Sequence, residues 1–129
     1  MAVNEKISRG LKSAITYLEN SVLALNKEDE KAFADSLWHV AAELEYTLFL
    51  FSMLFQNEID QSRWKPNVKL QVETGSTLMD VQNLLNESGK SVANEKLLDA
   101  YKSAYAARHY VLKVQEDLAR QKRKMLKRK

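Results

Sequence analysis

A chain of 129 residues with 45% hydrophobic and 29% charged side chains is long enough to bury one core and too apolar to be disordered. Its three glycines and single proline are too few for the many turns of an all-β protein, which favours a few long helices. The net charge of +3 hides an asymmetry, because residues 1–119 carry a net charge of −4 and the last ten residues carry +7. We therefore expect a helical domain over residues 1–119 and a basic extension over residues 120–129.

Three further absences bear on where the protein acts. The chain contains no cysteine, which excludes disulfides and thiolate zinc sites. The first residues lack the apolar stretch of a secretory signal. The longest apolar run, residues 46–55, would span about 15 Å as a helix, roughly half of a bilayer core. We expect a cytoplasmic protein without a transmembrane segment.

The first predicted helix is amphipathic and ends near Asn26. Asn26 tolerates the left-handed conformation that ends helices, and Asp29 is a typical N-cap for a following helix. Such a short turn predicts an antiparallel helical hairpin. The apolar residues of the first helix follow at spacings of three and four, namely Ile7, Leu11, Ala14, Ile15, Leu18, Val22 and Leu25.

The second predicted helix, residues 30–56, is apolar on every side from Tyr46 onward. A helix of this kind has to be enclosed on every side, which a lone hairpin cannot do. The pattern therefore predicts a larger bundle and a homodimer or larger assembly. Its main stripe consists of Phe33, Leu37, Val40, Ala41, Leu44, Leu48, Phe51 and Phe55, and Phe49, Leu50, Met53 and Leu54 cover the remaining sides.

Two more helices are predicted after a polar crossover loop, residues 57–67, which contains Trp64 and Pro66. The third helix is interrupted by Gly75 and is expected to stop at Gly89, with Ser91 as N-cap of the fourth helix. Nothing breaks the fourth helix before the C-terminus, because no glycine or proline follows Gly89. The expected fold is an all-α, antiparallel four-helix bundle whose long last helix extends as a basic arm. The apolar positions of the third helix are Leu70, Leu78, Val81 and Leu85.

The basic C-terminal segment predicts binding to RNA or another polyanion. Several cations on one segment neutralise phosphates without reading their sequence. A second interpretation is contact with an anionic membrane surface through Leu118, Met125 and Leu126, and a third is a solvated helix end stabilised by the helix dipole. The candidate binding residues are Arg120, Lys122, Arg123, Lys124, Lys127, Arg128 and Lys129.

No catalytic apparatus is evident, and we expect neither a cofactor nor a metal. The chain lacks a Gly-rich phosphate loop and a nucleophile elbow, and it lacks the Glu-x-x-His pairs of di-iron bundles. The alternative is a metal-dependent or RNase site built from His39 and Glu43, which share one helix face, and His109. Tyr101, Tyr105 and His109 should form a ladder on one face of the last helix, which is typical of a core or interface. A purely structural oligomerisation subunit is the third hypothesis.

Residues 18–45 contain four segments that carry a family resemblance: Leu18-Glu19, Ala24-Leu25-Asn26-Lys27-Glu28-Asp29, Ala32-Phe33-Ala34 and Leu37-Trp38-His39-Val40-Ala41-Ala42-Glu43-Leu44-Glu45. Together they resemble the opening hairpin of small prokaryotic HEPN-type helical domains. The resemblance implies a dimerising domain of four or five helices, which in some members is an RNase with an Arg-x4-6-His motif on a late helix. This sequence departs from that motif, because Arg108 and His109 are adjacent.

Overall fold

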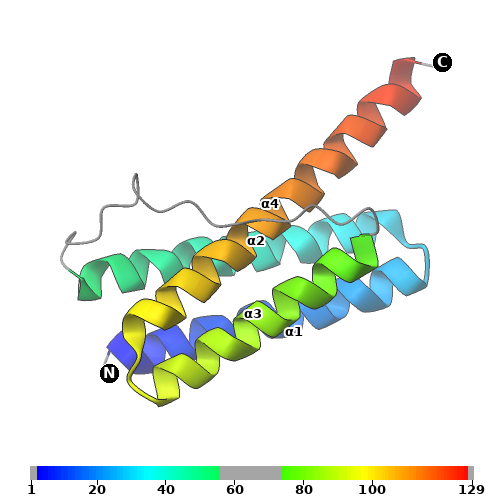
Figure 1. Ribbon diagram of the computed structural model, residues 1–129. Helices are drawn as coiled ribbons and strands as arrows, with labels where there is room; N and C mark the ends of the chain where they lie inside the picture. Colours follow the sequence, from blue (N-terminus) through cyan, green and yellow to red (C-terminus); the bar gives the residue numbers. More distant parts are fainter. Residues whose placement is uncertain (1–2, 56–73, 128–129) are drawn as a thin grey trace.

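Four α-helices make up the computed structural model, which describes residues 3–55 and 74–127 (Figure 1). No strand occurs in these two ranges, so the prediction of an all-helical chain is confirmed for the described residues. The predicted crossover loop, with Trp64 and Pro66, lies outside them, as does Leu70. The helices are α1 (Val3–Asn26), α2 (Glu30–Leu54), α3 (Thr74–Ala93) and α4 (Leu97–Lys127).

The turn between α1 and α2 lies where the sequence predicts it, although a different residue adopts the left-handed conformation. Asp29 caps α2 by accepting a hydrogen bond from the Ala32 backbone N–H at 3.1 Å, as expected of an N-cap. The left-handed residue is Glu28, with φ of 57°, and not Asn26. Asp29 N–H donates to Ala24 C=O and Glu28 N–H to Leu25 C=O, the paired bonds of a Schellman motif.

Gly10 of α1 brings the first two helices into close contact. A Cβ atom added at Gly10 would lie 2.2 Å from Thr47 Oγ1 of α2, so only glycine fits this approach. Both residues are buried, and the Thr47 hydroxyl donates to Glu43 C=O of its own helix at 2.7 Å. The α1–α2 contact at this point therefore depends on shape and involves no hydrogen bond between the two helices.

The second hairpin corrects the predicted helix boundary. The helix α3 does not stop at Gly89 but continues to Ala93, and Ser91 is a residue of α3 and not the N-cap of α4. Two contacts favour the longer helix: the buried Ser88 hydroxyl donates to Ala100 C=O of α4 at 2.7 Å, and Val92 is buried. The turn is again a Schellman motif, with Glu95 left-handed at φ of 61°.

Each helix contacts two others, which makes the arrangement four-sided. The helix α1 packs on α2 and α3, and α4 packs on α3 and α2, while the described residues form no comparable contact between α1 and α4 or between α2 and α3. Figure 1 shows the direction of each helix: α2 and α3 run opposite to α1 and α4.

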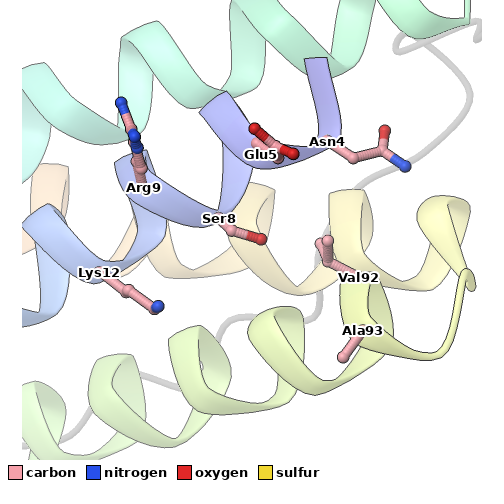
Figure 2. A pocket seen from close by; sticks show the side chains of 7 residues that line it. All are labelled: Asn4, Glu5, Ser8, Arg9, Lys12, Val92 and Ala93. Carbon is pink, nitrogen blue, oxygen red and sulfur yellow. The ribbon is translucent and has the colours of Figure 1, made fainter. Parts of the chain in front are cut away.

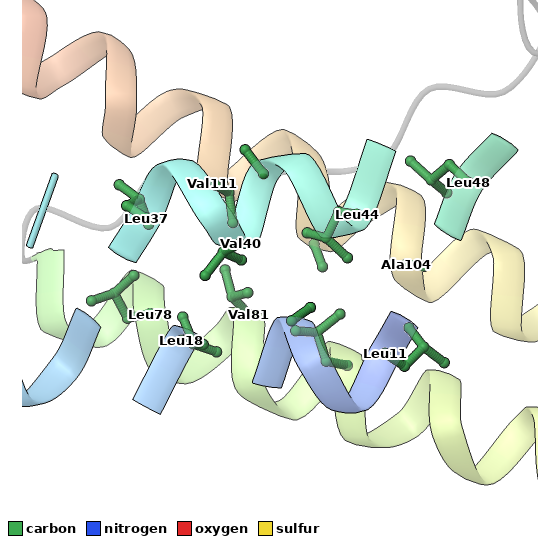
Figure 3. Packing of buried hydrophobic residues seen from close by; sticks show 14 of the residues in the cluster. Leu11, Leu18, Leu37, Val40, Leu44, Leu48, Leu78, Val81, Ala104 and Val111 are labelled. Atoms are coloured by element: carbon green, nitrogen blue, oxygen red, sulfur yellow. The ribbon is translucent and has the colours of Figure 1, made fainter. Parts of the chain in front are cut away.

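A single apolar core lies between the four helices (Figure 3). It explains the predicted stripes, because every residue of the main α2 stripe except Phe55 is buried. Phe55 is partly buried and packs against the core. Side chains from all four helices meet in the core, including Leu11, Leu18, Leu37, Leu44, Leu78, Val81, Ala104 and Val111.

The outer side of α2 differs from the prediction that this helix is enclosed. Leu50 is buried on this helix, but Phe49 and Met53 are exposed, as are Tyr46 and Trp38. All four of these exposed side chains are large hydrophobic residues. The other three helices therefore cover only part of the apolar surface of α2.

Candidate functional site

The candidate polyanion site lies at the C-terminal end of α4. The helix passes residue 119 without a break and continues to Lys127, so five of the seven predicted cations lie on one helix, while Arg128 and Lys129 fall outside the described residues. In Figure 1 this end of α4 projects beyond the ends of the other helices. We call residues 120–127 the basic arm.

Charges change along α4 from balanced to strongly positive. Before the arm, Lys113 pairs with Glu116 at 3.5 Å, and Asp117 pairs with Arg120, the first residue of the arm, at 3.9 Å. Farther along there is no acidic residue, and the arm itself carries five cations. Within the described part of the chain, no ion pair involves Lys122, Arg123 or Lys124, and all three are exposed.

Most of the arm's cations share one side of the helix. Since successive residues are rotated by about 100°, positions 120, 123, 124 and 127 fall within a sector of about 100°. Lys122 lies on the opposite side. Four cationic positions therefore lie within one sector over two helical turns.

The alternative site of His39, Glu43 and His109 is not assembled. His39 is exposed and stacks on Tyr17 of α1, with ring centroids 4.5 Å apart and an interplanar angle of 13°. His109 packs instead against Tyr105 on α4, with centroids 4.7 Å apart. No group of three or more His, Asp or Glu residues in the ranges 3–55 and 74–127 is arranged to hold a metal ion.

The surroundings of His109 keep its imidazole neutral. Burial of the ring lowers its pKa below the ordinary value of 6.5, and the neighbouring Arg108 guanidinium lowers the pKa further. Arg108 itself forms an ion pair with Glu45, which links α4 to α2. The Nε2 atom of His109 is buried and has no hydrogen-bond partner among the described residues. A partly buried ring that packs on Tyr105 of its own helix fits a structural role.

The aromatic ladder predicted on α4 is present and belongs to the core. Tyr101 and Tyr105 lie with ring centroids 5.8 Å apart, and His109 continues the row. Tyr101 is buried and makes edge contacts with Phe51 of α2 and with Phe55, the C-cap of α2, at centroid distances of 5.7 Å and 6.1 Å. The ladder therefore joins α4 to α2, and in this position it is not available to line a ligand pocket.

One surface feature was not predicted: an open groove of about 460 Å³ between the start of α1 and the end of α3 (Figure 2). Its polar lining combines one acid, Glu5, with two cations, Arg9 and Lys12. No sequence pattern indicates this groove, because Val92 and Ala93, which form its other wall, were expected in the fourth helix. The remaining lining residues are Asn4 and Ser8.

Comparison with known proteins adds no assignment to this geometry. No family model, no curated protein and no solved structure matches the chain. None of the helices in the described part of the chain has both the length and the apolar character needed to cross a bilayer.

Proposed function

We propose that this chain is a non-enzymatic assembly protein that binds RNA or another polyanion in the cytoplasm through the basic arm. In this proposal the four helices form an antiparallel bundle that acts as a homo-oligomer, and α4 extends from the bundle as a continuous arm. The observation that carries the proposal is the row of exposed cations beyond Asp117, where α4 holds no further acidic residue.

The helical form of the arm gives this charge its effect. Cations held on a helix lie at fixed spacings of one or two turns and lose little further entropy when they meet phosphates. The opposite net charge of residues 1–119 repels a polyanion from the bundle while the arm attracts it. Binding is therefore directed to one end of the molecule and should be strongly salt-dependent.

The two rival interpretations of the arm have less support. Insertion into an anionic membrane surface needs an apolar side, and among the arm side chains that the structure describes only Leu126 is a large exposed hydrophobic residue. A solvated helix end stabilised by the helix dipole needs cations only in the last turn, whereas here they begin at Arg120, two turns earlier.

The direct test replaces Arg120, Arg123, Lys124 and Lys127 together by glutamine, which preserves helix propensity and removes four charges. We expect affinity for a single-stranded RNA, measured by fluorescence anisotropy at low salt, to fall by at least tenfold. The slope of log K against log salt should become shallower by roughly 0.7 for each phosphate that the variant no longer neutralises.

A matched variant controls for net charge. Replacing Lys6, Lys31, Lys90 and Lys102 by glutamine removes the same charge from exposed positions on the four helices. This control should bind RNA like the unmodified chain. Equal loss in both variants would mean that only net charge matters, and unchanged binding in the arm variant would overturn the proposal. Equal affinity for a DNA duplex or a non-nucleotide polyanion would identify the ligand as polyanions in general.

A further inference from the structure

The outer side of α2 carries a continuous stripe of exposed apolar side chains. Trp38, Tyr46, Phe49 and Met53 are 60%, 50%, 59% and 53% exposed, and the small residue Ala42 lies between them. At about 100° per residue these five positions fall within a sector of about 80°. We call them the α2 stripe.

The size of the α2 stripe falls within the range of about 300–600 Å² that the largest apolar patches of monomeric proteins have, and such patches often have a function. If each large side chain presents roughly 200 Å² when fully exposed, the four together leave about 450 Å² of apolar area in water. Monomeric proteins rarely expose contiguous apolar patches larger than a few hundred Å², and those that do usually bind something there. The stripe therefore has the character of an interface.

The charges around the stripe favour a protein partner over a polyanion. Between Ala32 and Leu54 the helix holds three acidic residues, Asp35, Glu43 and Glu45, and no lysine or arginine. Stacking of RNA bases on Trp38 would bring phosphates close to these carboxylates. The same carboxylates disfavour an anionic membrane surface. We therefore expect the basic arm and the α2 stripe to bind different partners.

The α2 stripe is complementary to itself. Trp38 and Phe49 are eleven residues apart, about three turns, and project from nearly the same side of the helix. Ala42 lies between them, and its side chain is small enough to leave room for an aromatic ring of a partner. When a second copy lies antiparallel, Trp38 of each copy meets Phe49 of the other, and both Ala42 residues lie beside the two-fold axis.

Two acidic residues lie in or beside this contact: Asp35, within the sector of the stripe one turn before Trp38, and Glu45, whose charge is already neutralised. Glu45 lies next to the line between Trp38 and Phe49, where two copies would bring two carboxylates together. It forms an ion pair with Arg108 of α4 in its own chain. At this position each copy therefore presents a neutral ion pair, which removes most of the repulsion between the two Glu45 carboxylates.

We propose that the α2 stripe is the interface with a second copy of this chain, paired antiparallel about a two-fold axis near Ala42. The proposal rests on the assembly part of the proposed function and adds its surface and geometry. The four large side chains of two copies supply about 900 Å² of the roughly 1,200–2,000 Å² that stable interfaces bury, and the polar rim has to supply the rest.

Light scattering coupled to gel filtration tests the interface. One chain has a mass of 14.9 kDa. At micromolar concentration the unmodified chain should have twice this mass, and Phe49→Lys should have the mass of a single chain. Leu23→Lys is the matched control, because Leu23 is 56% exposed on α1 and lies outside the stripe, and it should remain dimeric. Circular dichroism should show the same helix content in all three. A monomeric unmodified chain, or a dimeric Phe49→Lys variant, would overturn the proposal.

Cysteine cross-linking tests the position of the axis, because the natural chain contains no cysteine. Ala42→Cys should form a disulfide-linked dimer under mild oxidation in a yield several times that of Asn20→Cys, an exposed position on α1. Equal yields would show that the two copies do not meet at Ala42.

The two proposals can fail independently. Phe49→Lys should become monomeric and still bind RNA through the arm, whereas the arm variant should lose RNA binding and remain dimeric. A Phe49→Lys variant that loses RNA binding without any change in mass would identify the stripe as part of the RNA site and overturn the inference.

Discussion

The two hairpins of this protein are closed in the same way and held together differently. In both hairpins the first helix ends in a Schellman turn with a glutamate in the left-handed conformation, Glu28 after α1 and Glu95 after α3. The α1–α2 hairpin is tightened by the missing side chain of Gly10, whereas α3 and α4 are joined by the hydrogen bond from Ser88 to Ala100. The turns are therefore similar, and the contact between the two helices of each hairpin is determined by particular side chains along those helices.

The largest effect is expected at Gly10. A Cβ atom at this position meets Thr47 Oγ1, so Gly10→Ala should destabilise the protein by about 2 kcal/mol despite the better helix propensity of alanine. Gly89 has open space around its Cβ position, and Gly89→Ala should stabilise α3 by about 0.5–1 kcal/mol. Urea unfolding measures both changes.

A rescue experiment assigns the Gly10 effect to the contact with Thr47. Thr47→Ala removes the atoms that the new Cβ would meet, so the double variant Gly10→Ala, Thr47→Ala should be more stable than the sum of the single changes predicts. Additive losses would show that the helices separate for another reason.

The next largest effect is expected at Ser88. Its hydroxyl is buried and bonds across the hairpin, so Ser88→Ala should cost about 1 kcal/mol. Ser21 is the matched control: it is equally buried, but its hydroxyl donates to Tyr17 C=O of its own helix at 3.0 Å. Ser21→Ala should stay within about 0.5 kcal/mol of the unmodified protein. Equal losses would contradict a special role for the bond between helices.

The sequence predicted the first hairpin better than the second for a physical reason. Asp29 is a strong local cap, and the apolar spacing of α1 and α2 agrees with it. At Gly89 and Ser91 the local signals for a turn conflict with tertiary contacts, and burial of Ser88 and Val92 wins. Local propensity is a weak guide where burial opposes it.

The candidate sites show the same difference between features that the local sequence determines and features that depend on tertiary packing. The continuity of α4 up to Lys127 was predicted, because the sequence has no glycine or proline after Gly89. The separation of His39 from His109 was not predicted from the sequence, since it depends on how α2 and α4 are rotated in the bundle. For the same reason the sequence indicated that α2 needs covering without showing which side stays open.

A smaller effect, of opposite sign, is expected at the two turns. A left-handed conformation is unfavourable for glutamate and free of strain for glycine, so Glu28→Gly and Glu95→Gly should each stabilise the protein by up to about 1 kcal/mol. The turns lie at opposite ends of the bundle in Figure 1, and the two gains should add. Asn94→Gly, next to Glu95 but without positive φ, should give no gain. A gain at Asn94 equal to that at Glu95 would contradict the explanation.

The smallest effect concerns His109 of α4, which is next to Arg108, the residue that forms the ion pair with Glu45 of α2. Because the folded-state pKa of this imidazole is lowered, the unfolded chain binds the proton more tightly. The contribution to stability is therefore complete above pH 6.5 and is lost as the pH falls from 6.5 to the lowered folded-state pKa. We expect His109→Phe to flatten the decline in unfolding free energy between pH 7 and pH 5. An identical decline in His109→Phe would show that His109 does not sense pH and that acid weakens the hairpin contact through other groups.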